Sequence, residues 1–187
     1  PYADEVTKNI KEACQTAGFP YMRILRENTD MTENVTGSAK AHIRVADSMR
    51  EAVDLLNDKP YLEKNILLTT GSKHLPDYTK IQDYQNRAYL RLLPSPEMLQ
   101  KAVDTGFLPA HLIAMQGPFS QELNVALIKQ SGIGVLVTKQ SGKSGGFEEK
   151  ISAAEQTGTD VIVIKRQKQE DGKNLSEAEA ELKKLMT

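Results

Sequence analysis

The sequence predicts an α/β fold in which a parallel sheet is covered by helices on both faces. From residue 39 onward, short apolar segments alternate with segments whose apolar residues recur every three or four positions. That alternation is typical of strand–helix units, which build parallel sheets. The 187 residues are enough for one well-buried domain or for a domain with an added fragment.

The first 38 residues fit this pattern less well. Apolar residues from Tyr2 onward share one helical face, and Gly18 is a plausible end of that helix. Residues 21–25 alternate weakly and predict a strand. Residues 27–38 lack periodicity and predict a loop or linker.

The remaining elements follow from residue 39 to the end of the chain. Ser48 with Glu51 forms a capping-box pattern, and Ser95 with Pro96 marks a second helix start. The predicted elements are, in order, a strand at 43–46, a helix through 49–56, a strand at 65–69, a strand at 88–93, a helix through 96–103, a strand at 112–115, a helix after Ser120, a strand at 133–137, a helix through 151–154, a strand at 161–164 and a final helix capped by Ser176 and Glu179.

Three polar, glycine-containing loops follow predicted strands, at 70–73, 116–120 and 138–146. In open parallel sheets the ligand binds beyond the carboxyl ends of the strands. Because the carboxyl ends of parallel strands share one edge, we expect these loops to lie along one edge of the domain.

The first two loops each allow two interpretations. Ser72 and Lys73 can contact an anion where Gly71 lets the backbone approach closely, or the loop only caps the next segment. In the second loop Ser120 is expected to cap a helix in either case. Gln116 and Gly117 then form either a tight turn or part of a ligand site.

The loop at 138–146 is the strongest candidate for an anion site. Its glycines, serines and lysines can present backbone N–H groups, hydroxyls and ammonium groups to a phosphate or a carboxylate. It matches neither the P-loop nor the dinucleotide fingerprint, and a solvated loop remains the alternative. The candidate contacts are Lys139, Ser141, Gly142, Gly145 and Gly146.

Composition excludes several classes of function. A formal net charge of −1 gives no basic field for nucleic acid. The single cysteine, Cys14, allows no internal disulfide and indicates a reducing, cytoplasmic compartment. No apolar run is long enough for a membrane span. The scattered histidines make no metal site with Cys14, and His74 and His111 are more typical of surface or hydrogen-bonded residues than of acid–base catalysts.

Three segments together resemble a known family. Residues 67–73, 113–124 and 137–150 are similar, in wording, order and spacing, to the precorrin-6A (6x) reductases of cobalamin biosynthesis. Pro1–Ala3 resembles the end of that family's Asp-Ala-Thr-His-Pro-Tyr-Ala segment, and Tyr21–Arg23 resembles its Leu-Arg-Leu strand. The resemblance covers nearly the whole chain.

The resemblance implies a domain organisation. Residues 39–187 correspond to a C-terminal Rossmann-like domain, and residues 1–38 to a remnant of an N-terminal Rossmann-like domain plus a linker. The family's Gly-Gly-Thr-x-Glu segment has no match here. We therefore expect the C-terminal part of such a protein, inactive alone and able to self-associate through residues 1–26.

The resemblance also implies an activity, the NADPH-dependent reduction of a macrocycle double bond in precorrin-6A or cobalt-precorrin-6A. The tetrapyrrole would lie between the two Rossmann-like domains, with Tyr2 facing it. Whether the substrate carries cobalt, which loop binds cofactor or substrate, and which group donates the proton stay open. The alternatives are a non-catalytic nucleotide- or tetrapyrrole-binding module and an enzyme of the uroporphyrinogen-III synthase type, which uses no nicotinamide.

Overall fold

A computed structural model describes residues 2–24, 41–140, 146–165 and 172–185, without the side chains of residues 2–5, 184 and 185. The chain divides into two compact units, one formed by residues 1–29 with 168–187 and the other by residues 30–167. The carboxyl-terminal helix therefore groups with the amino-terminal one. The domain boundary expected after residue 38 stays a prediction.

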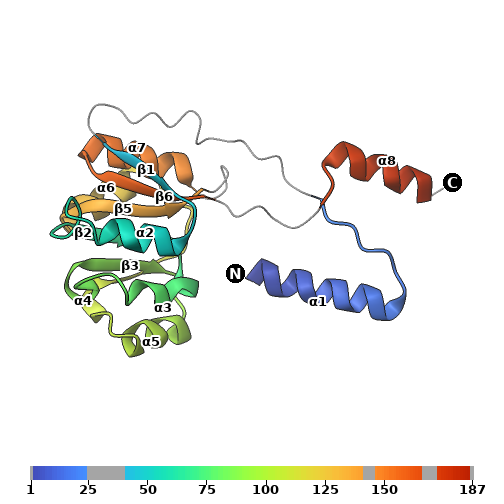
Figure 1. Ribbon diagram of the computed structural model, residues 1–187, viewed down its shortest axis with the longest axis horizontal. Coiled ribbons are helices and arrows are strands. Elements are labelled where there is room, and N and C mark those ends of the chain that lie inside the picture. The colour runs from blue at the N-terminus through green and yellow to red at the C-terminus, as the bar shows by residue number, and fades with distance from the viewer. Residues whose placement is uncertain (1, 25–40, 141–145, 166–171, 186–187) are drawn as a thin grey trace. The chain divides into compact units, whose positions relative to one another are not determined.

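The larger unit is built on a parallel sheet, as the sequence predicts (Figure 1). Within the described residues six strands pair in the order β1-β6-β5-β2-β3-β4, and every pairing is parallel. All carboxyl ends therefore lie at one edge. The strands are β1 (Ile43–Ala46), β2 (Asn65–Leu68), β3 (Ala88–Leu92), β4 (Leu112–Ala114), β5 (Ile133–Lys139) and β6 (Asp160–Ile164).

Helices cover both faces of this sheet. Alternate strand residues point to opposite faces, so Leu68 packs in one apolar cluster with α2, α3 and α5, while Leu67 packs in a second cluster with α6 and α7. We call these the first face and the second face. The helices are α2 (Met49–Leu56), η1 (Ser72–His74), α3 (Leu75–Tyr78), α4 (Tyr84–Arg87), α5 (Pro96–Asp104), η2 (Pro109–His111), α6 (Gln121–Gln130) and α7 (Phe147–Thr157).

The strand order reverses between β2 and β5. From β2 the chain proceeds to β3 and β4, and it then returns to β5 beside β2 before reaching β6. The connection after β2 leads to the first face and the connection after β5 to the second. Adjacent strands with diverging connections mark the place where α/β sheets bind ligands. The loops at 70–73 and 138–146 begin there.

The caps predicted at Ser48 and Ser120 are confirmed, and the cap predicted for the final helix is wrong. The helix start at Ser95 and Pro96 is also confirmed, but the Ser95 side chain makes no capping hydrogen bond. The Glu51 N–H donates to Ser48 Oγ over 3.2 Å, and the Leu123 N–H donates to Ser120 Oγ over 3.3 Å. The final helix, α8 (Leu175–Leu185), begins earlier than expected from Ser176 and Glu179. Asn174 and Glu177 cap this helix reciprocally. The Glu177 N–H donates to Asn174 Oδ1, and the Asn174 N–H donates to Glu177 Oε2, each over 2.9 Å.

The smaller unit contains α1 (Tyr2–Ala17) and α8. Gly18 ends α1 as predicted, with φ +70°, a left-handed conformation that glycine adopts without strain. The strand expected at 21–25 is wrong, since the described part of that segment forms only an isolated bridge between Ile24 and Lys173. In the described part of the chain, no helix is long and apolar enough to cross a membrane.

Candidate functional site

One group of side chains lies where β2 and β5 end side by side. The Thr69 N–H donates to the Val137 carbonyl over 3.0 Å, which extends the pairing of the two strands. Gly71 follows with φ +84°, a conformation that residues with a Cβ rarely adopt. The chain then enters η1 and α3. We call Thr70, Gly71, His74, Asp77, Tyr78 and Lys139 the junction site.

Tyr78 fixes the backbone of this site. Its hydroxyl donates to the Gly71 carbonyl over 2.9 Å and also contacts Thr70 Oγ1. The side chain is fully buried, and burial raises the pKa of Tyr78 well above its usual range. The phenol therefore stays protonated and holds the loop after β2 in one conformation.

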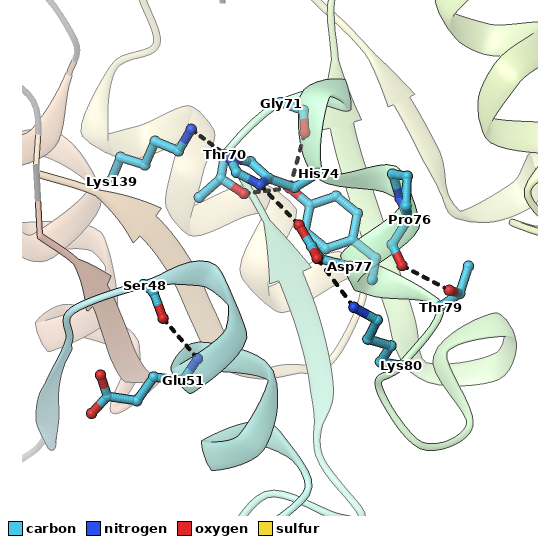
Figure 2. Close-up of polar contacts among 11 residues, drawn as sticks. Ser48, Glu51, Thr70, Gly71, His74, Pro76, Asp77, Thr79, Lys80 and Lys139 are labelled. Carbon is cyan, nitrogen blue, oxygen red and sulfur yellow. Dashed lines mark hydrogen bonds and ion pairs between the residues drawn. The ribbon is translucent and has the colours of Figure 1, made fainter. Parts of the chain in front are cut away.

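Lys139 and His74 meet across the junction. Lys139 Nζ lies 2.9 Å from His74 Nε2, and His74 Nδ1 lies 3.2 Å from Asp77 Oδ2 (Figure 2). Burial and then the Lys139 charge lower the pKa of His74, against the opposing hydrogen bond to Asp77. The imidazole is therefore neutral at neutral pH, accepting from Lys139 and donating to Asp77. This arrangement holds an ammonium group at the carboxyl end of β5.

Ser72 and Lys73 are the other predicted residues of the first loop, and they are not among the junction-site residues. Ser72 Oγ donates to Met98 Sδ over 3.1 Å and is half-buried. Lys73 is exposed. Gly71 and Lys139 are therefore the two predicted residues that the structure brings into the junction site, and neither prediction of a ligand contact is tested by this geometry alone.

In the second loop Gln116, Gly117 and Ser120 are exposed. The Ser120 hydroxyl caps α6, as expected. A Cβ added to Gly117 would lie 3.0 Å from a ring carbon of Phe119, so this glycine allows the aromatic ring to fold back over the turn. Their ligand contacts stay predictions.

The remaining predicted residues are placed as follows. Gly146 is buried, with φ +62°, directly before α7. Tyr2 lies on α1 in the other compact unit, and its side chain lies outside the described residues. Ser141, Gly142 and Gly145 also lie outside the described residues.

Sequence reasoning missed two buried cations on the second face, Arg91 and Lys150, each 6% exposed. Both carried a signal. Arg91 stands in the otherwise apolar strand at 88–92, and Lys150 follows Phe147 by three residues on one side of α7. Among the described residues, no group of His, Cys, Asp and Glu is arranged to hold a metal ion.

Comparisons with known proteins agree on one family. The family model described as precorrin-6x reductase CbiJ/CobK matches residues 1–184. The cobalt-precorrin-6A reductase of Priestia megaterium is 36% identical over 177 residues, which cover 92% of this chain and 64% of that protein. The cobalt-precorrin-6A reductase of Methanothermobacter thermautotrophicus is 34% identical over 166 residues, which cover 89% of this chain and 52% of that protein.

A solved structure, CobK precorrin-6A reductase, is similar in fold. Its TM-score is 0.63 at 23% sequence identity, and the match covers 94% of this chain and 66% of that one. The chain spans between about half and two thirds of the length of the relatives it matches.

Proposed function

The chain belongs to the precorrin-6x reductase family, and from this membership we propose that it contributes to the NADPH-dependent reduction of precorrin-6A or cobalt-precorrin-6A. One observation supports a specific site for this function: Lys139 contacts His74 at the point where the strand order reverses. We propose that this junction site binds the cofactor.

The residues present suit an anionic cofactor. NADPH carries three phosphate groups, and Lys139 offers an ammonium group whose direction is set by a neutral imidazole. Gly71 has no atom within 4 Å of the position that a Cβ would take, so a ligand could approach its backbone closely. Charge-assisted hydrogen bonds of this kind contribute about 1.5–3 kcal/mol each.

When bound, the nicotinamide supplies the hydride. The chain's task is to bind and orient, since holding two reactants in one geometry removes much of the entropic barrier. Lys139 would hold a phosphate, His74 would hold Lys139, and Tyr78 would keep the loop after β2 in place. Gln116 and Ser120 would orient the ligand, with Ser72, Lys73, Gly117, Ser141, Gly142, Gly145 and Gly146 as further contacts.

Because the relatives are longer than this chain, we propose that residues beyond it complete the active site. Val6 and Ile10 on α1 are half exposed, which agrees with a helix that packs on such a region or on a second copy. We place the reaction in the cytoplasm, in keeping with the single cysteine.

Turnover tests this function. We would join the amino-terminal part of the Priestia megaterium relative to this chain and follow NADPH oxidation with cobalt-precorrin-6A and with precorrin-6A. The hybrid should turn over and this chain alone should not. Lys139→Ala should lower kcat/KM of the hybrid by roughly tenfold or more, because a charge-assisted contact is lost.

Two other outcomes would favour the alternatives. A folded hybrid that binds NADPH and tetrapyrrole without turnover would indicate a binding module. A folded hybrid that binds tetrapyrrole and never binds NADPH would indicate an enzyme of the uroporphyrinogen-III synthase type. Exposed Lys129 provides the matched control, and Lys129→Ala should leave kcat/KM unchanged.

A further inference from the structure

The second loop, at 116–120, follows a strand at the edge of the sheet. This strand, β4, pairs with β3 and with no second strand among the described residues. The Met115 N–H donates to the Leu92 carbonyl over 3.0 Å, which extends the pairing by one residue. Four of the five loop residues are exposed, and Phe119 is half-buried. Phe119 is therefore the loop residue best placed to anchor the loop to the domain.

Arg91 lies beneath the Phe119 ring. Leu90 and Leu92 pack on the first face, so Arg91 between them points to the second face, which α6 covers. The Arg91 side chain is 6% exposed, and its guanidinium carbon lies 4.0 Å from the centre of the Phe119 ring. A cation at this distance is attracted by the electrons of the ring face. Arg91 thus holds the loop from the side of the sheet.

A second contact joins Arg91 to the end of the loop. Arg91 Nη1 donates to Asn124 Oδ1 over 2.8 Å, and Asn124 is 1% exposed. The side-chain nitrogen of Asn124 donates to the Ser120 carbonyl over 2.8 Å. Because Arg91 fixes the oxygen of this amide, it also directs the amide nitrogen toward Ser120. The backbone at the end of the loop is therefore held through Asn124.

The Phe119 ring extends this support toward the start of the loop. A Cβ added to Gly117 would lie 3.0 Å from a ring carbon, so the ring lies against the backbone of Gly117. Gln116 directly precedes that glycine. In the proposed function Gln116 and Ser120 orient the ligand, and the segment that joins them is supported by Arg91 through two separate contacts.

Both contacts depend on the shape of the arginine side chain. A planar guanidinium can stack on an aromatic ring with its face while the N–H groups at its edge donate hydrogen bonds. A lysine has its charge at one point, and a single ammonium group cannot replace both contacts. Burial lowers the pKa of Arg91 to about 10, so the side chain is still charged at neutral pH.

We propose that Arg91 is a positioning residue, which holds the loop at 116–120 in the conformation that receives the ligand. What the loop receives rests on the proposed function, whereas the support of the loop rests on the contacts of Arg91. A loop without this support would adopt the receptive conformation for only a fraction of the time, and the apparent affinity would fall by that fraction. Ligand at saturation selects the receptive conformation, so Arg91 should act mainly on KM.

Steady-state kinetics of the hybrid with the Priestia megaterium relative test this role. Arg91→Lys should raise KM for NADPH or for the tetrapyrrole roughly fivefold or more, while kcat changes less than about twofold. The substrate whose KM rises is the one that the loop contacts. Arg44→Lys, at an exposed position of β1, should leave both KM values unchanged. An active hybrid in which Arg91→Lys leaves both KM values unchanged would overturn the proposal.

Variants of Phe119 distinguish this role from a general loss of structure. Phe119→Leu removes the ring from a half-buried loop position and should raise the same KM, whereas Phe119→Tyr keeps a ring and should not. The double variant Arg91→Lys/Phe119→Leu should raise KM by less than the product of the two single effects, because both substitutions remove one shared contact. Two effects that multiply would contradict a role of Arg91 through Phe119.

Backbone dynamics test the same role without turnover. In this chain alone, NMR order parameters of the loop amides should be about 0.85 in the wild type and below about 0.6 in Arg91→Lys, with those of α5 unchanged. If these values fall and the wild-type hybrid lacks turnover, the proposed function fails and the support of the loop by Arg91 stands. If the order parameters of the loop stay the same in Arg91→Lys, the proposal fails whatever the hybrid does.

Discussion

Arg87→Met should lower the free energy of unfolding by about 3–5 kcal/mol, the largest effect that we expect from a single substitution in the larger unit. Arg87 is 4% exposed and ends α4. Its guanidinium joins four backbone carbonyls from separate segments, and the substitution removes this donor from all four, although the Tyr61 carbonyl still accepts from the Lys64 N–H. These are the carbonyls of Gln82 at 2.7 Å, Tyr61 at 2.6 Å, Lys64 at 3.2 Å and Leu56 at 3.0 Å.

Urea unfolding monitored by circular dichroism measures this effect. The free energy of unfolding of Arg87→Lys should lie between those of the wild type and Arg87→Met, because a lysine keeps the charge but cannot reach all four carbonyls. Arg50→Met, at an exposed position of α2, should change the stability by less than about 0.5 kcal/mol. A loss below about 1 kcal/mol for Arg87→Met would contradict the role given to this side chain.

The second large effect depends on pH. Burial lowers the folded-state pKa of Lys150 to about 8, from 10.5 for the unperturbed side chain. Below pH 8 the folded protein carries the full cost of the buried charge, and that cost disappears as pH rises toward the unfolded-state value. The unfolded chain binds more protons in this interval, so stability rises with pH, by about 2 kcal/mol between about pH 7 and about pH 9.5.

Lys150→Met should remove this component. The difference in unfolding free energy between Lys150→Met and the wild type should favour the variant near neutral pH and shrink by about 2 kcal/mol over the same interval. The unfolding free energy of Lys129→Met, at an exposed position of α6, should change with pH in the same way as that of the wild type. A difference that stays constant with pH would show that Lys150 is not a buried cation in the folded protein.

Sequence patterns predicted the sheet well, because the strands from 43 to 164 are short and mainly apolar, and the helices after Ser48, Ser95 and Ser120 begin at a recognisable local signal. Ser48 and Ser120 cap their helices through contacts only three residues away. The short helices α3 and α4 were not predicted. Their segment lacks apolar periodicity, and the contacts from Arg87 to carbonyls as far away as Leu56 depend on the completed fold.

The candidate site could likewise be predicted from the sequence only in part, because its contacts depend on the completed fold. Lys139 was predicted from a loop composition that suits anions, whereas the pairing of its ammonium with His74 joins residues 65 positions apart. Only the strand order brings β2 beside β5. Arg91 was overlooked because it lies within an otherwise apolar strand.

Titrating NADPH into this chain by calorimetry tests the central claim, that the junction site binds the cofactor. We expect micromolar binding that prefers NADPH to NADH, weakens roughly tenfold or more in Lys139→Ala and is unchanged in Lys129→Ala. Binding that ignores Lys139, or no binding at all, would contradict it. The loops after β2 and β5 would then be better interpreted as holding the carboxylates of the tetrapyrrole.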